Sequence, residues 1–380
     1  MIEQIKLEDV CDVIAGQSPP SSTYNQEGNG TPFFQGKADF GETYPTVRYW
    51  CDSPKKMSEP DDILFSVRAP VGPTNINNIN ACIGRGLAAI RCREIERNYL
   101  LHYLRGNEEK ISSLGSGSTF KAITIGTLKD LKIPLPPLDQ QKKIAAILDA
   151  ADAYRQKTKA LIEKYDELTQ SLFLDMFGDP VINPKGWMEN FLGELVEIIT
   201  YGLTVRPAYT KEGFPVISAK EIKSGEVNFN DAKLIAKDDF DKVANKGKPE
   251  INEIIFTKTG AGIGQCAVIK VSENFAITQN IARIKFKKSI DVTYILFYLR
   301  TPYIQRLSHR ESKGNAIKDL QLGDMKKFKI LLPPFELQTQ FAERVKAIEE
   351  QKAQAQASLA QAEDLFNSLL QRAFKGELTS

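Results

Sequence analysis

Two stretches of the chain place apolar residues alternately three and four positions apart, and neither contains glycine or proline until Gly178 and Gly376 end them. This spacing is the seven-residue period of a coiled coil. It predicts two long helices, within residues 138–180 and 335–380, that pair with each other. At 1.5 Å per residue, about 36 residues give a helix of about 50 Å. The alternative is that each helix is largely exposed and packs only on its own domain.

The apolar seam of each predicted helix can be read residue by residue. In the first helix the seam consists of Ile144, Ile147, Ala151, Tyr154, Thr158, Leu161, Tyr165, Leu168 and Leu172. In the second it consists of Phe341, Val345, Ile348, Lys352, Ala355, Leu359, Ala362, Phe366, Leu369 and Ala373. Thr158 and Lys352 are polar residues within these seams, and polar seam residues usually fix the register or the choice of partner. The residues expected in the coiled coil or in a subunit interface are Ile147, Ala151, Tyr154, Leu161, Tyr165, Leu168, Leu172, Val345, Ile348, Leu359, Phe366 and Leu369.

The segments outside these helices contain short apolar runs rich in β-branched residues, and Gly, Pro and Asn separate the runs. One or two helices interrupt them, notably at 98–110 and 292–306. This pattern predicts an α+β fold with a mixed or antiparallel sheet in each of two domains, at residues 1–137 and 181–334.

An internal repeat supports the division into two similar domains. Five segments of the first half recur in the same order in the second half, at an offset that drifts only slightly. The pairs are LEDVCDVIAG with LGELVEIITYG, DILFSVRAPVG with EIIFTKTGAGIG, YLLHYLR with YILFYLR, GSTFKAI with GNAIKDL, and LKDLKIPLPPLDQQ with MKKFKILLPPFELQ. A repeat of this length indicates a pair of domains rather than the units of a solenoid.

Composition narrows the class of protein. The net charge of +2 conceals an uneven distribution, because residues 181–335 hold 24 Lys/Arg against 17 Asp/Glu. The first residues lack the features of a signal peptide, and no apolar run is long enough to span a membrane, so we expect a cytoplasmic protein. The cysteines form no C-x-x-C pair and predict reduced thiols; they are Cys11, Cys51, Cys82, Cys92 and Cys266.

The sequence contains no convincing catalytic motif. Its two histidines, His102 and His309, lie in different halves, and no metal-binding spacing surrounds them, so we predict neither catalytic residues nor a metal site. The loop Gly260–Gly264 lacks the Lys-Ser/Thr of a phosphate-binding loop and predicts a tight turn. Leu332 stands where an amino-methyltransferase needs a polar acceptor before Pro-Pro-aromatic. A solvated helix end explains Glu108–Lys110 better than a nuclease motif does.

Local charge suggests where DNA could bind. Residues 63–93 contain no acid, and a second acid-free run extends over 110–129. Basic side chains attract phosphates, and Arg and Asn on loops also read base edges. The expected counterparts of Arg68 and Lys121 in the second half are Lys258 and Lys318. The alternative for any single one of these residues is an exposed position with no role in DNA binding. The predicted DNA contacts are Arg68, Arg85, Arg91, Lys121, Lys220, Lys258, Arg283, Lys313 and Lys318.

The run from Lys132 to Pro180, with its P-L-P-P-L-x-x-Q-x-x-I-A-x-I-L-D-x-A-D text and S-L-F-L-D-M-F-G-D close, resembles the specificity subunit of type I restriction-modification enzymes. A weaker second copy extends from Leu332 to Leu378. The resemblance implies two target-recognition domains separated by two antiparallel coiled-coil helices. Each domain would read one half of a bipartite, asymmetric site in double-stranded DNA, and the helices would set the spacer.

The same resemblance implies partners that carry the chemistry. Two modification subunits would dock on the helices and hold S-adenosylmethionine, and restriction or translocase subunits would use ATP and Mg. This chain itself would hold no cofactor and would contact no membrane. The alternatives are a self-sufficient DNA methyltransferase or nuclease, and a coiled-coil scaffold that binds proteins rather than DNA.

Overall fold

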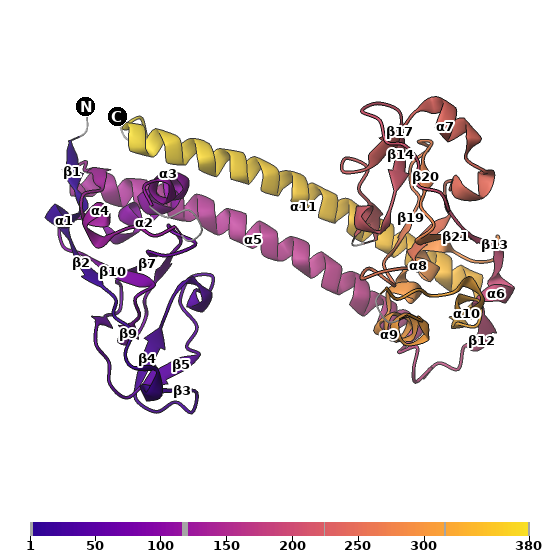
Figure 1. Cartoon of the computed structure of the whole chain (residues 1–380), viewed down its shortest axis with the longest axis horizontal. Helices are drawn as coiled ribbons and strands as arrows, with labels where there is room; N and C mark the ends of the chain where they lie inside the picture. The colour runs from indigo at the N-terminus through magenta and orange to yellow at the C-terminus, as the bar shows by residue number, and fades with distance from the viewer. Residues whose placement is uncertain (1–2, 116–120, 224, 315–316, 379–380) are drawn as a thin grey trace. The chain divides into compact units, whose positions relative to one another are not determined.

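The computed structural model describes residues 3–115, 121–223, 225–314 and 317–378 (Figure 1). The chain forms two compact units: unit 1 is Met1–Ala160 with Ala355–Ser380, and unit 2 is Leu161–Gln354. The two long helices are α5 (Leu138–Phe177) and α11 (Phe335–Lys375), and the division between the units falls within both of them. Each unit therefore contains the beginning of one long helix and the end of the other.

Unit 1 is built on a four-stranded antiparallel sheet of order β2-β10-β7-β8 and a five-stranded mixed sheet of order β3-β5-β4-β9-β6. Strands β4 and β9 pair in parallel. The strands of the first sheet are β2 (Cys11–Ala15), β7 (Ile63–Ser66), β8 (Thr74–Ile76) and β10 (Leu87–Cys92). Those of the second are β3 (Tyr24–Asn25), β4 (Thr31–Phe34), β5 (Tyr49–Cys51), β6 (Met57–Ser58) and β9 (Ala81–Ile83). The remaining elements are β1 (Gln4–Lys6), α1 (Leu7–Val10), η1 (Ser21–Thr23), η2 (Lys37–Asp39), α2 (Arg97–Gly106), α3 (Glu108–Ser113), α4 (Ile125–Lys129) and β11 (Lys132–Pro134).

Strand β7 is buried along its whole length because both of its faces are covered. Ile63 and Phe65 pack in the core that contains Tyr99 of α2. Leu64 points into a second core, with Phe34 and other residues of the mixed sheet. A strand covered on both sides loses the alternation of apolar and polar residues, which explains its continuous apolar sequence.

Unit 2 repeats this plan with a smaller second sheet. Its antiparallel sheet has the order β13-β21-β18-β19, and its three-stranded mixed sheet has the order β17-β14-β20. The strands are β13 (Val196–Tyr201), β14 (Phe214–Ile217), β17 (Lys233–Ile235), β18 (Ile254–Thr257), β19 (Cys266–Val268), β20 (Ala276–Ile277) and β21 (Ile281–Phe286). The other elements are β12 (Met188–Phe191), α6 (Leu192–Leu195), η3 (Ala219–Glu221), β15 (Ile222–Lys223), β16 (Glu226–Val227), α7 (Lys237–Lys242), η4 (Asn245–Gly247), α8 (Val292–Arg300), α9 (Pro302–Glu311), α10 (Leu322–Met325) and β22 (Lys329–Leu332).

The repeated sequence segments form equivalent elements in the two units: α1 matches α6, β7 matches β18, α2 matches α8, and β11 matches β22. The fourth pair, GSTFKAI with GNAIKDL, lies partly outside the described residues. Gly16 and Gly202 occupy equivalent positions, and at both of them the neighbouring backbone leaves no room for a Cβ. A Cβ at Gly16 would lie 2.1 Å from the oxygen of Gly84, and one at Gly202 would lie 1.9 Å from that of Ile277. The expected pair of similar α+β domains is confirmed.

The end of one long helix packs on a tyrosine pair in each unit. In unit 1 the Phe374 ring of α11 lies 5.3 Å from that of Tyr99 and 5.1 Å from that of Tyr103, between centroids. In unit 2 the Phe177 ring of α5 lies 4.7 Å from that of Tyr294. Burial raises the pKa of Tyr294, whose hydroxyl donates to the backbone oxygen of Leu331.

Contacts within unit 1 show how its two helix segments are oriented. Lys159 of α5 lies 3.5 Å from Glu363 of α11. Arg155, which comes earlier in α5, lies over the ring of Phe366, which comes later in α11, at 4.6 Å. The two segments therefore run in opposite directions.

Unit 2 shows the same orientation. The Nζ atom of Lys352 lies 2.6 Å from Oδ1 of Asp166. Phe341, earlier in α11, packs on Phe173, later in α5, with ring centroids 5.7 Å apart. Within each unit, α5 and α11 form the antiparallel pair that the sequence analysis expected.

The buried face of α5 differs from the predicted seam at every second position. Five of the nine predicted residues, spaced seven positions apart, are buried or half-buried: Ile144, Ala151, Thr158, Tyr165 and Leu172. The others are exposed: Ile147 (39%), Tyr154 (55%), Leu161 (43%) and Leu168 (49%). The row one residue later is buried or half-buried instead, at Leu148, Arg155, Ile162 and Thr169. Those four assignments to the seam were wrong because Arg155 and Thr169 hide the true row. In α11 all ten predicted seam residues are buried or half-buried.

Candidate nucleic-acid interface

A four-residue turn joins β9 to β10 in unit 1 and carries Arg85 at its tip. The N–H of Leu87 donates to the oxygen of Gly84 at 2.9 Å, which closes the turn. The backbone N–H of Arg85 donates to Oγ of Ser18 at 3.1 Å. These bonds fix the backbone of the turn, whereas the Arg85 residue itself is exposed.

Two further predicted contacts lie beside this turn. The N–H of Val67 donates to the oxygen of Gly86 at 3.0 Å. Arg68 follows Val67 and Arg85 precedes Gly86, so this hydrogen bond brings the backbones of the two arginines close together. Arg68 forms an antiparallel bridge with Ala122, which brings Lys121 alongside. Arg68, Arg85 and Lys121 are all exposed. Three cationic side chains from different parts of the sequence thus begin from neighbouring points on one surface, an arrangement suited to phosphate oxygens.

The equivalent place in unit 2 is only partly cationic. The N–H of Lys258 donates to the oxygen of Asn280 at 2.9 Å, so Lys258 occupies the position of Val67, not that of Arg68 as the sequence suggested. Thr259 is the counterpart of Arg68, because it bridges to Asp319 as Arg68 bridges to Ala122.

Lys258 is engaged within the protein. Its side chain is 11% exposed, and Nζ lies 2.6 Å from Oδ1 of Asp319. Burial favours the protonated form of Asp319, but hydrogen bonds from Lys258 and Thr259 outweigh that effect and hold the pKa of Asp319 below its usual value. The expectation of a DNA-facing Lys258 is therefore corrected: its ammonium stabilises a carboxylate at the end of β18.

Arg283 is the clearest departure from the predicted DNA contacts. It is 4% exposed, and its Nε and Nη2 donate to the two carboxylate oxygens of Glu253 at 2.6 and 2.8 Å. Its Nη1 donates to the backbone oxygen of Asn245. A guanidinium held in this way is part of the core, so its assignment to the DNA surface was wrong.

Arg91 has the same kind of role in unit 1. Its Nε and Nη2 lie 2.9 and 3.0 Å from the two carboxylate oxygens of Asp62, and Nη1 lies 2.9 Å from Glu59. Asp62 is 2% exposed, so Arg91 neutralises a buried carboxylate. The prediction that Arg91 faces DNA is corrected in the same way.

The other basic residues predicted in unit 2 are exposed. Lys318 adjoins the turn at Gly260, whose N–H donates to the Lys318 backbone oxygen at 2.9 Å. Lys313 lies 3.0 Å from Asp324 but keeps a side chain that is 74% exposed. Lys220 lies in η3, next to Ala219, which faces the loop at Gly262. These three remain candidate contacts around the end of β18.

Comparison with known proteins identifies the family. A family model described as the type I restriction modification DNA specificity domain matches residues 2–165 and 184–363. The chain belongs to this family. The two matches place one specificity domain in each half, and we refer to them as the first and second specificity domains.

Relatives of the chain are named as specificity subunits. A putative type I restriction enzyme MjaX specificity subunit from Methanocaldococcus jannaschii is 47% identical over 178 residues, which are 46% of this chain and 42% of that protein. The type I restriction enzyme EcoBI specificity subunit of Escherichia coli is 27% identical over 99% of this chain and 86% of its own length. The predictions of a DNA-recognition chain and of a non-catalytic subunit are confirmed at this level.

A solved structure shares the fold. The S subunit of a type I restriction-modification system from M. genitalium superimposes with a TM-score of 0.63 at 19% identity, and the match covers 98% of this chain and 96% of that one.

The second specificity domain contains basic residues that sequence reasoning missed. Lys246 Nζ lies 5.2 Å from the ring centroid of Tyr201. Lys233 Nζ and the guanidinium carbon of Arg206 lie 4.7 and 5.7 Å from the centroid of Tyr209. These cations are exposed, and no described carboxylate forms a salt bridge with them. The available signal was the co-occurrence of tyrosines and cations within residues 201–246, but the packing of cation on ring depends on the fold.

The histidine of the first specificity domain, His102, has a structural role. His102 is 2% exposed, and its Nε2 lies 2.8 Å from Oδ1 of Asp149, as expected for a packed histidine. Asn98 donates to the other oxygen of Asp149 at 2.7 Å. Within the described ranges, no three His, Cys, Asp or Glu side chains form a group that could hold a metal ion.

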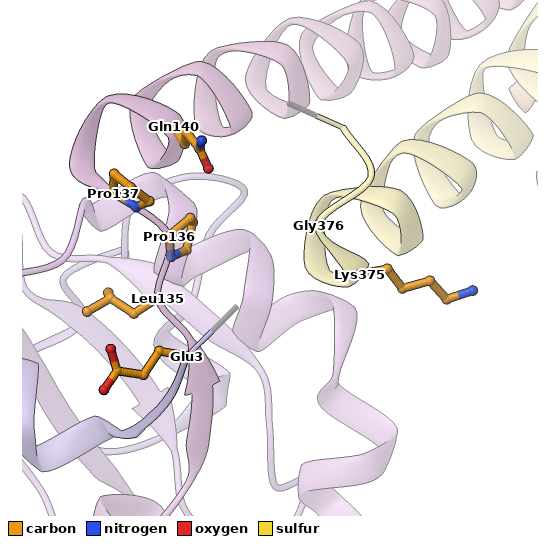
Figure 2. Close-up of a pocket in the computed structure, with 7 residues that line it drawn as sticks. All are labelled: Glu3, Leu135, Pro136, Pro137, Gln140, Lys375 and Gly376. Atoms are coloured by element: carbon orange, nitrogen blue, oxygen red, sulfur yellow. The ribbon is translucent and has the colours of Figure 1, made fainter. Parts of the chain in front are cut away.

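A depression on the surface of this domain also lacks converging catalytic groups. It lies where α5 begins and α11 ends, and its lining includes Glu3, Pro136, Pro137 and Lys375. Figure 2 shows Glu3 and Lys375 pointing away from each other. Across the part of the chain that the structure describes, no helix is both long and apolar enough to cross a membrane.

Proposed function

We propose that this chain is the DNA-recognition subunit of a type I restriction-modification system, and that each specificity domain reads one part of a bipartite, asymmetric site. The observation that carries the proposal is the exposed cluster of Arg68, Arg85 and Lys121, which meets at the end of β7 beside a fixed turn. Phosphate contacts of this kind position a protein on duplex DNA, and arginines at loop tips also read bases. The second domain has the same fold with different side chains at this place. The short base sequence that it recognises, which we call its word, therefore differs.

The partners that the proposal implies are two modification subunits, and restriction subunits in the complete system. S-adenosylmethionine, ATP and Mg belong to those chains. A surface suited to the modification subunits is the stripe of exposed apolar residues that occurs every seven positions on α5: Ile147, Tyr154, Leu161 and Leu168. Residues at this spacing fall on one side of a helix and are typical of helix–helix contacts.

The experiment is a DNA-binding titration of the full chain with its modification subunit on a duplex that contains the target, monitored by fluorescence anisotropy. We expect the double variant R68A/R85A to weaken binding, by about 1–3 kcal/mol for each lost base contact. R93A is the matched control, because Arg93 follows β10 whereas Arg85 precedes it, and six strand residues of about 3.3 Å each separate the two. Unchanged affinity in R68A/R85A would contradict the proposal.

A further inference from the structure

The second specificity domain has a turn equivalent to the one that carries Arg85. It joins β20 to β21 and consists of Thr278–Ile281, where the N–H of Ile281 donates to the oxygen of Thr278 at 3.1 Å. The N–H of Thr278 donates to Ile217 at 3.0 Å, just as the N–H of Gly84 donates to Phe34 at 2.8 Å in the first domain. Both turns therefore begin at the same point on the mixed sheet.

Arg85 and Gln279 occupy the same position in these turns. Each is the second residue, and each donates its backbone N–H to the loop that follows the first strand of the antiparallel sheet. Arg85 donates to Oγ of Ser18 at 3.1 Å, and Gln279 donates to the oxygen of Leu203 at 2.9 Å. The neighbouring hydrogen bonds of Val67 with Gly86 and of Lys258 with Asn280 complete the correspondence.

Both side chains are available to a ligand. Arg85 and Gln279 are exposed, and neither side chain forms a hydrogen bond or salt bridge with any described residue. Their backbones are fixed at the turn, so each side chain starts from a rigid point, which lowers the entropy lost on binding. This contrasts with Arg91 and Arg283, whose guanidinium groups are occupied by buried carboxylates.

The two side chains differ in the base that they recognise best. Arginine donates two hydrogen bonds to O6 and N7 of guanine, whereas glutamine accepts from N6 and donates to N7 of adenine. We propose that this turn is a specificity-determining position in both domains: Arg85 reads a guanine in the word of the first domain, and Gln279 reads an adenine at the equivalent position of the second word. This inference rests on the proposed function and adds to it which base each turn selects.

The test exchanges the two residues. The full chain and its modification subunit select bound duplexes from a randomised pool, for the wild type and for R85Q, Q279R and the control R93Q. We expect R85Q to change one base of one word from guanine to adenine, by about 10-fold in preference. Q279R makes the reverse change in the other word, and R93Q leaves both words unchanged. Either exchange decides the question if the other variant fails to fold, as judged by circular dichroism.

The remaining outcomes are distinct. Weaker binding of R85Q to all sequences, with a smaller dependence of affinity on salt, identifies a phosphate contact and overturns base reading while leaving the proposed function intact. Unchanged words in both exchange variants also overturn the inference. Failure of the wild-type complex to enrich any sequence contradicts the proposed function itself.

Discussion

The side-chain oxygen of Gln141 accepts a hydrogen bond from the backbone N–H of Glu96 at 2.8 Å, and its amide nitrogen donates to the oxygen of Pro136 at 2.8 Å. One glutamine thereby fixes the beginning of α5 to the segment that caps α2. Gln338 repeats the arrangement in unit 2, where it accepts from Asp291 at 3.0 Å and donates to Pro333 at 2.8 Å.

We predict that Q141L destabilises the protein because it leaves the buried oxygen of Pro136 and the half-buried N–H of Glu96 without partners. Gln141 is 2% exposed, and an unpaired buried donor or acceptor costs about 1–3 kcal/mol. The measurement is the free energy of unfolding in urea. Q170L, at an exposed glutamine of the same helix, is the control and should change stability by less than about 0.5 kcal/mol. Equal stability of the two variants would show that the Gln141 bonds contribute nothing.

We predict a larger loss for R283M. Removal of the guanidinium leaves Glu253, which is 1% exposed, as an unpaired buried carboxylate, at a cost of about 3–5 kcal/mol. The double variant R283M/E253M should recover part of this stability, because it removes both charges. Urea unfolding of the single and double variants measures the difference. R85M is the control for the loss of an exposed arginine, and an R283M protein as stable as R85M contradicts the structural role.

The Lys258–Asp319 pair predicts a pH dependence of stability. The folded-state pKa of Asp319 is lowered, so the pair contributes fully above the unfolded value of about 3.9 and is lost as the pH falls through the lower folded-state value. We expect wild-type protein to lose more unfolding free energy than D319N when the pH falls from 5 to 2. Unfolding curves at several pH values measure this, and identical losses in the two proteins would argue against the pair.

The exposed stripe on α5 predicts that substitutions in it weaken binding of the modification subunit without lowering the stability of the chain. L161Q and L168Q remove apolar surface that no described residue covers fully, so we expect little change in the free energy of unfolding. We expect both to weaken binding of the modification subunit, measured by isothermal titration calorimetry. L114Q is the matched control, because Leu114 is 51% exposed and lies outside the long helices. Undiminished binding by L161Q and L168Q would exclude the stripe from the interface.

The sequence revealed the long helices more reliably than it revealed which of their faces is buried. In α11 the seam is apolar at nearly every position, and the heptad pattern identified its buried face. In α5 two apolar rows compete, and the buried one includes Arg155 and Thr169, while Tyr154 and Leu168 are exposed. Hydrophobicity alone therefore selected the wrong second row, because the true row includes Arg155, whose packing on the ring of Phe366 depends on the fold.

The basic residues illustrate a similar limit. An acid-free stretch drew attention to the segment that contains Arg68 and Arg85, which are exposed and adjacent. It could not separate them from Arg91, because the carboxylate that binds Arg91 belongs to Asp62, just before that stretch and 29 positions away. Local charge counts report nothing about pairs that form only when strands align.

We propose that one chain contains two different DNA readers. The decisive measurement is a map of the methylated adenines in a cell that expresses the complete modification complex. We expect one asymmetric motif made of two different short words with a constant number of unspecified bases between them. A single continuous or palindromic motif would contradict it, as would DNA methylation by the purified chain alone.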